Sequence, residues 1–191
     1  MKNRKFSVSL LCFALVAFGA LRVFAAVTES STNVPLAIPD NGNVNSTLTF
    51  SVNGTISDAN LTVNISHTWN DDIELRLSSP SIAAQLLWQD CGGSGDNLTN
   101  TVIDQQAAGL SPCTFAGAPF TGSFQPTDGT GAAPAAASGT MTAFNGSDSG
   151  GVWTLNVVDD STICTGTLNA WSLTLDGTPP LPVELMTLEI S

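Results

Sequence analysis

Residues 61–66 read Leu-Thr-Val-Asn-Ile-Ser, an alternation of apolar and polar side chains with a period of two. This period predicts a β-strand that buries one face. The same alternation recurs at residues 48–52, 73–77, 153–157 and 171–175. Turn-forming pairs such as Asn53-Gly54 and Asp176-Gly177 separate these stretches, and no stretch has the period of a long helix. We therefore predict an all-β fold, an antiparallel β-sandwich of jelly-roll type.

The first 25 residues have the features of an export signal. Met1–Lys5 is basic, and Val8–Leu21 is apolar but short for a membrane span. Val23 and Ala25 are small residues at the positions that a signal peptidase requires, which predicts cleavage after Ala25. We expect the mature protein to be secreted or at the cell surface, and no later apolar run predicts a membrane span.

The remainder of the chain divides into three parts. Residues 26–44 are polar and contain prolines, which predicts an entry segment. Residues 45–177 carry the alternating stretches and form the domain, and residues 178–191 are a C-terminal tail. Within the domain, residues 90–151 are expected to be a long loop-rich region, and loops of that length in a compact domain are usually functional or held by a ligand.

The charge of the chain is unevenly distributed. The sequence has five Lys and Arg residues and 16 Asp and Glu residues. Four of the five basic residues lie before residue 23, so residues 26–191 contain a single basic side chain, Arg76, and have a net charge of −15. Such a chain lacks the cations that phosphates require, which excludes nucleic-acid binding and disfavours anionic membranes. Cations are the expected partners.

Three cysteines follow the leader: Cys91, Cys113 and Cys164. An exported domain normally pairs its cysteines, and an odd number leaves one over. We predict a Cys91–Cys113 disulfide, because it closes a loop rich in Gly, Asn and Asp. Cys164 is then a free thiol, either buried or available for intermolecular pairing. The alternative is that all three are small core residues.

Several ordered motifs resemble the P domain, or Homo B domain, that follows the catalytic domain in kexin-like and furin-like subtilases and recurs in bacterial exported proteases. They are Ile65-Ser66-His67-Thr68-Trp69-Asn70-Asp71-Asp72-Ile73-Glu74-Leu75, Leu77-Ser78-Ser79-Pro80, Asp96-Asn97-Leu98, Thr101-Val102-Ile103-Asp104, Pro119-Phe120-Thr121-Gly122-Ser123-Phe124-Gln125-Pro126, Phe144-Asn145-Gly146-Ser147-Asp148, Gly151-Val152-Trp153-Thr154-Leu155 and Thr165-Gly166-Thr167-Leu168-Asn169-Ala170-Trp171-Ser172-Leu173. The resemblance covers roughly residues 45–176. The chain departs from the family pattern at Asp71, Gln105 and Cys164, where the family has Gly, Asp and Asp.

The resemblance implies a galactose-binding-like jelly roll and a non-catalytic role. The family's protease is a separate subtilisin-like domain, and no subtilase triad motif is present in this chain. The expected partner is a subtilisin-like protease or another extracellular protein. An alternative function is a stand-alone adhesive or carbohydrate-binding module, in which exposed aromatic side chains stack on sugars. Its candidates are Trp69, Trp88, Trp153 and Trp171, although their positions in or beside strands favour core packing.

A serine-protease triad is the third hypothesis. His67, Asp104 and Ser149 occur in a catalytic order, and Asp148-Ser149-Gly150-Gly151 resembles part of a nucleophile loop. A triad requires a base oriented by a carboxylate, and neither motif has its usual neighbours. His67 is the only histidine, so a hydrogen-bonded structural role is favoured and a zinc site is disfavoured.

The carboxylates support a calcium hypothesis. Asp71 and Asp72 precede a predicted strand, while Asp96 and Asp104 lie in the long middle region. Calcium takes six to eight oxygen ligands and tolerates irregular loops, and P domains of this kind resemble calcium binders. Asp72 and Asp104 match family aspartates. The alternative is that these four acids are solvated turn residues. A weaker second cluster is Asp148, Asp159 and Asp160.

Overall fold

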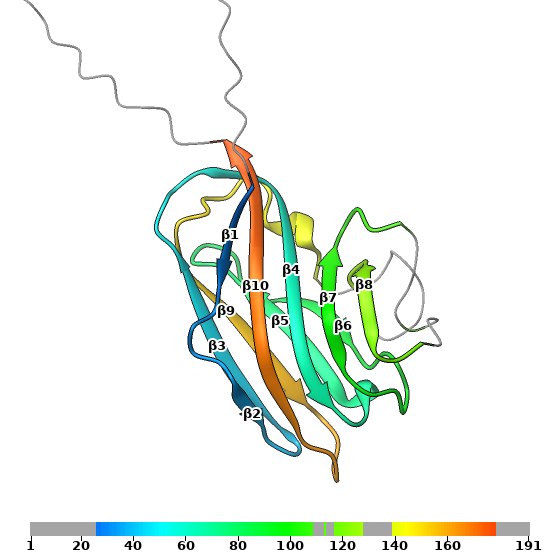
Figure 1. The fold of residues 1–191 in the computed structure, drawn as a ribbon. Coiled ribbons are helices and arrows are strands. Elements are labelled where there is room, and N and C mark those ends of the chain that lie inside the picture. The colour runs from blue at the N-terminus through cyan, green and yellow to red at the C-terminus, as the bar shows by residue number, and fades with distance from the viewer. Residues whose placement is uncertain (1–25, 109–112, 114–116, 128–138, 179–191) are drawn as a thin grey trace, which may run out of the picture.

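The computed structural model describes residues 26–108, 113, 117–127 and 139–178. The export signal and all but the first residue of the predicted tail lie outside these residues. Within them, the strands form two stacked sheets (Figure 1). The prediction of an all-β sandwich is confirmed. The elements are β1 (Val27–Ser30), β2 (Leu36–Ile38), β3 (Gly42–Phe50), β4 (Thr55–His67), the 3₁₀ turn η1 (Asn70–Asp72), β5 (Ile73–Ser78), β6 (Gln85–Gln89), β7 (Leu98–Asp104), β8 (Phe120–Phe124), the 3₁₀ turn η3 (Met141–Phe144), β9 (Gly151–Asp159) and β10 (Gly166–Thr178).

One sheet has the order β1-β10-β4-β7-β8, with β2 also paired to β10, and the other has the order β3-β9-β5-β6. The pairs are antiparallel except for β7 and β8, which are parallel. The longest pair joins β4 to β10, with His67 opposite Gly166 and Thr55 opposite Thr178. The register therefore defines two ends of the sandwich. We call them the His67 end, where β4 and β9 end and β5 begins, and the Val52 end, where β3 and β10 end and β4 begins.

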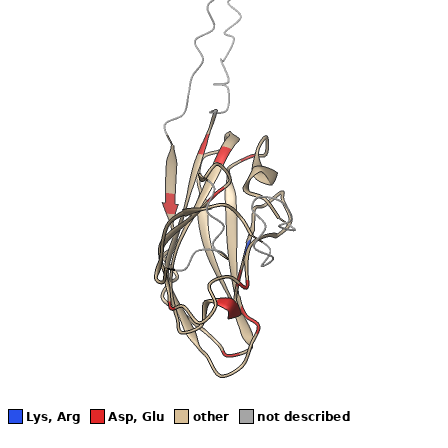
Figure 2. Cartoon of the chain, turned by 90° about the vertical axis from the view of Figure 1, so that its right-hand side faces the viewer, with Lys and Arg blue, Asp and Glu red and all other residues tan. Residues whose placement is uncertain are grey.

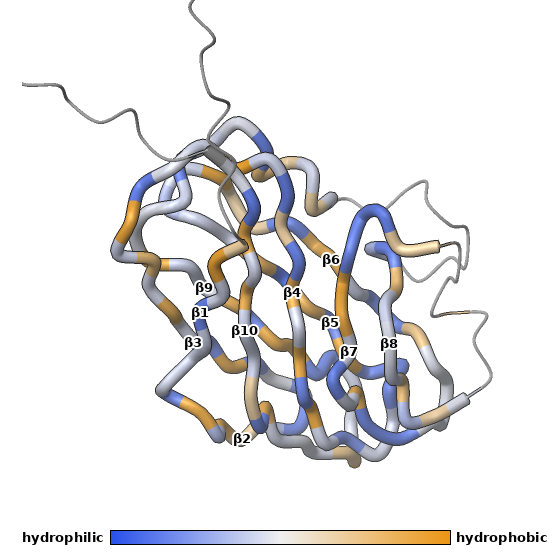
Figure 3. The backbone as a smooth tube through the Cα atoms, turned by 45° about the horizontal axis from the view of Figure 1, so that its top comes forward, coloured by the Kyte–Doolittle hydropathy of each residue, from blue (hydrophilic) through white to orange (hydrophobic). Residues whose placement is uncertain are grey.

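The core consists of the inward side chains of both sheets, as the period of two predicts. Hydrophobic and hydrophilic residues alternate along the strands (Figure 3). Trp88, Trp153 and Trp171 are buried, so the core-packing interpretation is confirmed for these three. Trp88 packs edge-to-face on Phe120, with ring centroids 5.6 Å apart. Trp69 is 44% exposed. A platform of four tryptophans for sugar stacking is therefore not present.

Local structure differs from the sequence-based expectation in three places. Residues 90–151, predicted to be rich in loops, also contain the strands β7 and β8. These two strands were missed because their sequences contain Thr, Asn and Gly in place of a regular apolar alternation. The strand predicted over residues 48–52 ends at Phe50, and Val52 lies outside it, 55% exposed. The segment 26–44 also contributes β1 and β2, both paired with β10.

The predicted Cys91–Cys113 disulfide is present, with Cα atoms 4.4 Å apart. Thr127 lies beside both sulfurs, with its Oγ1 3.5 Å from Cys91 Sγ and 3.2 Å from Cys113 Sγ. Cys164 is a free, partly exposed thiol. In the described part of the chain, no helix is both long enough and apolar enough to cross a membrane.

Candidate cation site

Acidic residues gather at the His67 end, around the turn η1 (Figure 2). Four short segments bring them together: η1, the start of β5, the residue after β6, and the end of β9 with the residue after it. These segments are neighbours because β5 pairs with both β6 and β9. The carboxylates are Asp71, Asp72, Glu74, Asp90, Asp159 and Asp160.

The loop that follows Cys91 packs against η1 and holds it in place. Asp71 Oδ1 accepts a hydrogen bond from Gly93 N at 2.8 Å, and Asp71 N donates to Gly93 O at 3.3 Å. Gly92 has a φ of 114°, and a Cβ at this position would lie 2.6 Å from the ring of Phe120. Only glycine fits there, because the backbone is left-handed and passes directly over an aromatic ring. Through its bond to Gly93 N, the side chain of Asp71 holds this loop against η1.

Three carboxylates come close enough to share a cation. One oxygen each from Glu74, Asp90 and Asp160 lies within 4.8 Å of the other two. Calcium binds oxygen at 2.3–2.6 Å, so two ligands of one ion can be up to about 5 Å apart. The trio therefore fits a calcium ion. Arg76 Nη2 already contacts one oxygen of Glu74, Oε2, and is the only cation beside the trio within the described residues.

The pKa of Asp90 shows that negative charge in this cluster is not balanced. Burial, followed by the charges of Asp160 and Glu74, raises the pKa of Asp90 to about 6, against a weaker opposing hydrogen bond from Gln89. Its Oδ1 is buried without a hydrogen-bond partner. A carboxylate with a raised pKa and an open lone pair is held in a site that favours a bound cation or a proton.

Asp72 is a second carboxylate with a perturbed charge. Burial, then the charge of Asp159, raises its pKa, while His67 acts in the opposite direction. Its backbone oxygen accepts a hydrogen bond from Asp160 N at 3.0 Å, which holds the end of β9 against η1. Asp72 thus borders the trio.

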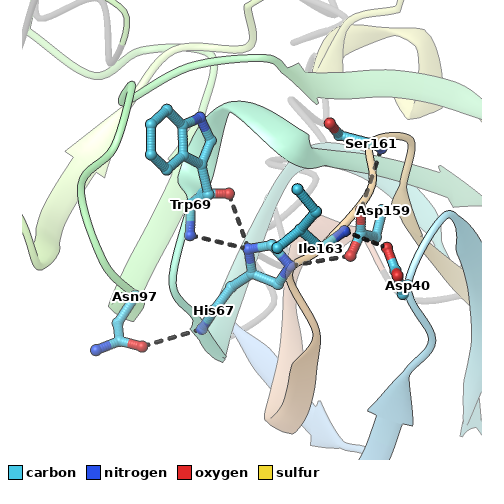
Figure 4. Close-up of polar contacts among 7 residues, drawn as sticks. All are labelled: Asp40, His67, Trp69, Asn97, Asp159, Ser161 and Ile163. Carbon is cyan, nitrogen blue, oxygen red and sulfur yellow. Dashed lines mark hydrogen bonds and ion pairs between the residues drawn. The ribbon is translucent and has the colours of Figure 1, made fainter.

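His67 and Asp159 form a buried, hydrogen-bonded pair beside this cluster (Figure 4). His67 Nε2 lies 3.1 Å from Asp159 Oδ2, and both side chains are inaccessible to solvent. His67 Nδ1 lies 2.8 Å from Trp69 O, and His67 N donates to Asn97 Oδ1 at 3.0 Å. The pair joins β4 of one sheet to β9 of the other. The predicted hydrogen-bonded, structural role of His67 is confirmed.

The hypothetical protease triad is not assembled. Ser149 N donates to Gly54 O at 2.8 Å and Ser149 Oγ donates to Val52 O at 3.0 Å, so Ser149 lies at the Val52 end. His67 lies at the other end of β4, a strand of 13 residues. At a rise of roughly 3.3 Å per residue, the two ends are about 40 Å apart.

The four aspartates predicted as calcium ligands occupy three places. Asp71 and Asp72 adjoin the trio, and Asp96 is exposed in the loop that packs on η1. Asp104 ends β7, opposite Asn60, and its Oδ1 accepts from Gln106 N at 2.7 Å to close a turn. It is six residues, or about 20 Å, along β7 from the His67 end. The four therefore do not form one site, and their role as calcium ligands stays a prediction.

The weaker cluster is also divided. Asp159 and Asp160 lie at the His67 end, whereas Asp148 Oδ1 accepts from Gly54 N at 3.1 Å at the Val52 end. The sequence analysis missed Glu74 and Asp90. Glu74 belonged to an alternating strand, where a polar residue is expected to face solvent, and Asp90 was one acid in a loop. Only the pairing of β5 with β6 and β9 shows that they meet.

The model of the family described as "Proprotein convertase P-domain" matches residues 56–175. The chain belongs to this family. Among solved structures, the P-domain is similar to the Aeromonas sobria serine protease in a complex with "the chaperone", with 19% identity, a TM-score of 0.51 and coverage of 83% of this chain. A second structure, the serine protease of Aeromonas sobria, has 17% identity, a TM-score of 0.47 and coverage of 82%. The match spans 27% of each protease chain. No curated protein matches the P-domain.

Proposed function

We propose that the chain is an exported, non-catalytic P-domain that serves as an accessory or interaction module for a subtilisin-like serine protease and is stabilised by calcium. The family match supports association with proteases. The separation of His67 from Ser149 supports a role without catalysis by these residues. The leader sequence and the Cys91–Cys113 disulfide support export, because disulfides persist in oxidising compartments.

The observation that carries the calcium proposal is the convergence of Glu74, Asp90 and Asp160 from three separate segments. These three side chains would hold the ion. Calcium supplies positive charge, and the P-domain's own residues supply the geometry. Glu74 is anchored by its strand and by Arg76, while the hydrogen bond from Asp160 N to Asp72 O positions the third ligand. A bound cation would thus join the ends of β5, β6 and β9.

The test compares thermal unfolding of the purified protein in calcium, in chelator, and in sodium chloride of matched ionic strength. We expect calcium to raise the melting temperature by about 5–10 °C, because saturation at about 100 times the dissociation constant adds about 2.7 kcal/mol. Sodium chloride should have a much smaller effect. Equal melting temperatures in calcium and in chelator would show that no such site exists.

A separate test addresses the protease. The candidate is a subtilisin-like protease from the same source that lacks a P-domain of its own. We expect the purified P-domain to bind it and to slow its thermal inactivation, while hydrolysing no peptide substrate itself. Hydrolysis that disappeared in Ser149→Ala would refute the non-catalytic role, and a protease whose inactivation is unchanged would refute the accessory role.

A further inference from the structure

An apolar cleft lies at the Val52 end, opposite the acidic cluster. Its enclosed volume is small, about 50 Å³, and the cleft opens to solvent, so it can accept one or two side chains rather than a whole small-molecule ligand. It lies between the start of β1, the end of β10 and the turn that joins β3 to β4, at the upper edge of the sandwich in Figure 1. Its apolar wall contains Val27, Phe50, Val52 and Leu175.

This cleft exposes apolar side chains that the fold does not cover. β3 ends at Phe50 and β4 begins at Thr55, so the turn between them leaves the space between the sheets open. Val27 is 36% and Val52 55% exposed. They are two of only five large apolar residues exposed in the described part of the chain. Apolar side chains that meet at one concave place mark an interaction site more often than scattered ones do.

One carboxylate at the cleft, that of Glu29, has no partner. Glu29 lines the cleft and is half-buried, and its side chain forms no hydrogen bond or ion pair with any residue that the structure describes. Glu29 shares the inward side of β1 with Val27, since the two are separated by two positions. Asp176 follows the buried Leu175, so its side chain points to the outer face of the sheet, opposite Asp58 on β4.

No described Lys or Arg side chain can balance the charge of Glu29. Arg76 is the only Lys or Arg after residue 25, and it contacts Glu74. The predicted cleavage after Ala25 would add one positive charge, the α-amino group of Ala26, three residues from Glu29. The residues that continue from β10, 179–191, contain two glutamates and no Lys or Arg. A partner can therefore supply a complementary Arg or Lys side chain that the described residues lack.

We propose that this cleft is a docking site for a segment of a partner polypeptide in which an aliphatic side chain adjoins an Arg or Lys. The aliphatic side chain packs on Val27 and Val52, and the cation pairs with Glu29. Arg and Lys suit this position because their apolar stems cover apolar surface while their charged ends reach a carboxylate. A neutral apolar segment would desolvate Glu29 without compensation, and an acidic one would be repelled. Binding at this cleft does not depend on calcium at the other end of the sandwich.

The test titrates isotopically labelled protein, in chelator, with two capped tripeptides, acetyl-Leu-Arg-Leu-amide and acetyl-Leu-Gln-Leu-amide, and follows the backbone amide resonances. We expect the Arg peptide to shift the amides of Val27, Val52 and Gly177, and to bind about tenfold more tightly than the Gln peptide, because a hydrogen bond between charged groups is lost in the latter. Equal affinities, an absence of shifts, or shifts confined to other regions would overturn the proposal.

Three variants locate the effect. Glu29→Gln should weaken the Arg peptide about tenfold and leave the Gln peptide unchanged, and its fold should persist because Glu29 has no described partner. Val52→Ser should weaken both peptides severalfold, since it removes exposed apolar surface. Asp40→Asn is the control for charge, because Asp40 lies outside the cleft and an amide oxygen can still accept from Ile163 N. If Asp40→Asn weakens the Arg peptide as much as Glu29→Gln does, the attraction is one of overall charge and the docking site is refuted.

Discussion

The two ends of the sandwich satisfy the polar groups at their strand ends in different ways. At each end the strands stop and their last polar groups must be satisfied. The His67 end closes with the buried His67–Asp159 pair, a disulfide-linked loop and converging carboxylates. The Val52 end closes with short turns whose polar contacts are mostly exposed, such as those of Ser149 and Asp148. It leaves an apolar cleft between the sheets.

This difference assigns the two ends different roles: the His67 end stabilises the fold, and the Val52 end is available for binding. Buried polar groups at the His67 end are specific and costly to break, because a lost partner leaves a desolvated charge. Exposed contacts at the Val52 end contribute little to stability, which leaves that end free to bind another molecule. The comparison predicts that equivalent changes at the two ends have unequal effects, and four measurements test it.

The largest effect is expected for His67→Ala. This change leaves the buried carboxylate of Asp159 without its hydrogen-bonded partner, and a buried charge that loses its partner in this way costs about 3–5 kcal/mol. The free energy of unfolding in urea measures it. Ser149→Ala at the Val52 end is the control and should cost less than about 1 kcal/mol, because it removes one exposed hydrogen bond. If both variants lose the same stability, the two ends do not differ as described.

The next effect comes from the disulfide that holds the loop against η1. Replacing Cys91 and Cys113 together with alanine should lower the free energy of unfolding by about 3 kcal/mol, because a closed loop of roughly 20 residues is released in the unfolded chain. Cys164→Ser, which removes the free thiol, should leave stability nearly unchanged. Urea unfolding without reductant provides the measurement, and a large loss in Cys164→Ser would contradict it.

Calcium is expected to bind at the His67 end, so variants there should change the calcium-dependent rise in melting temperature. Asp90→Asn and Asp160→Asn should each remove most of the calcium-dependent rise in melting temperature, because a neutral amide keeps the shape of the side chain and loses its charge. Asp104→Asn separates two hypotheses. If the trio alone holds the ion, this variant keeps the shift, and if Asp104 is a ligand as the sequence analysis predicted, the shift is lost. Thermal unfolding of all three variants in calcium and in chelator decides between them.

The smallest effect is a dependence of stability on pH in chelator. The raised pKa of Asp90, about 6, means that the folded protein retains a proton between pH 4 and 6 that the unfolded chain has released. Unfolding then releases a proton, so stability falls as the pH rises through this window. We expect a loss of about 1–2 kcal/mol, a value reduced for the partial exposure of Asp90. In Asp90→Asn the fall in stability that is due to Asp90 should be absent. Identical dependence of stability on pH in the variant and in the wild type would contradict this prediction.

Local patterns in the sequence predicted the features that depend mainly on residues close together in the chain. The period of two identified parts of β3, β4, β5, β9 and β10, because a buried strand face imposes that alternation on its own residues. The P-domain resemblance and the Cys91–Cys113 pair were also predicted. The strands β7 and β8 were missed, since Thr, Asn and Gly in them make β-structure only when neighbouring strands supply the pairing.

The carboxylate trio and the apolar cleft form only in the tertiary structure. Glu74, Asp90 and Asp160 are 16 and 70 residues apart in the chain, and they meet because β5 pairs with both β6 and β9. The cleft exists because β3 ends two residues before Val52 while β1 and β10 reach the same edge. Both are consequences of register between distant strands, which the alternation within one strand does not encode. The sequence by itself therefore determined parts of five strands, the family resemblance and the excess of negative charge. The packing of the sheets determined where that charge is concentrated and where apolar surface stays open.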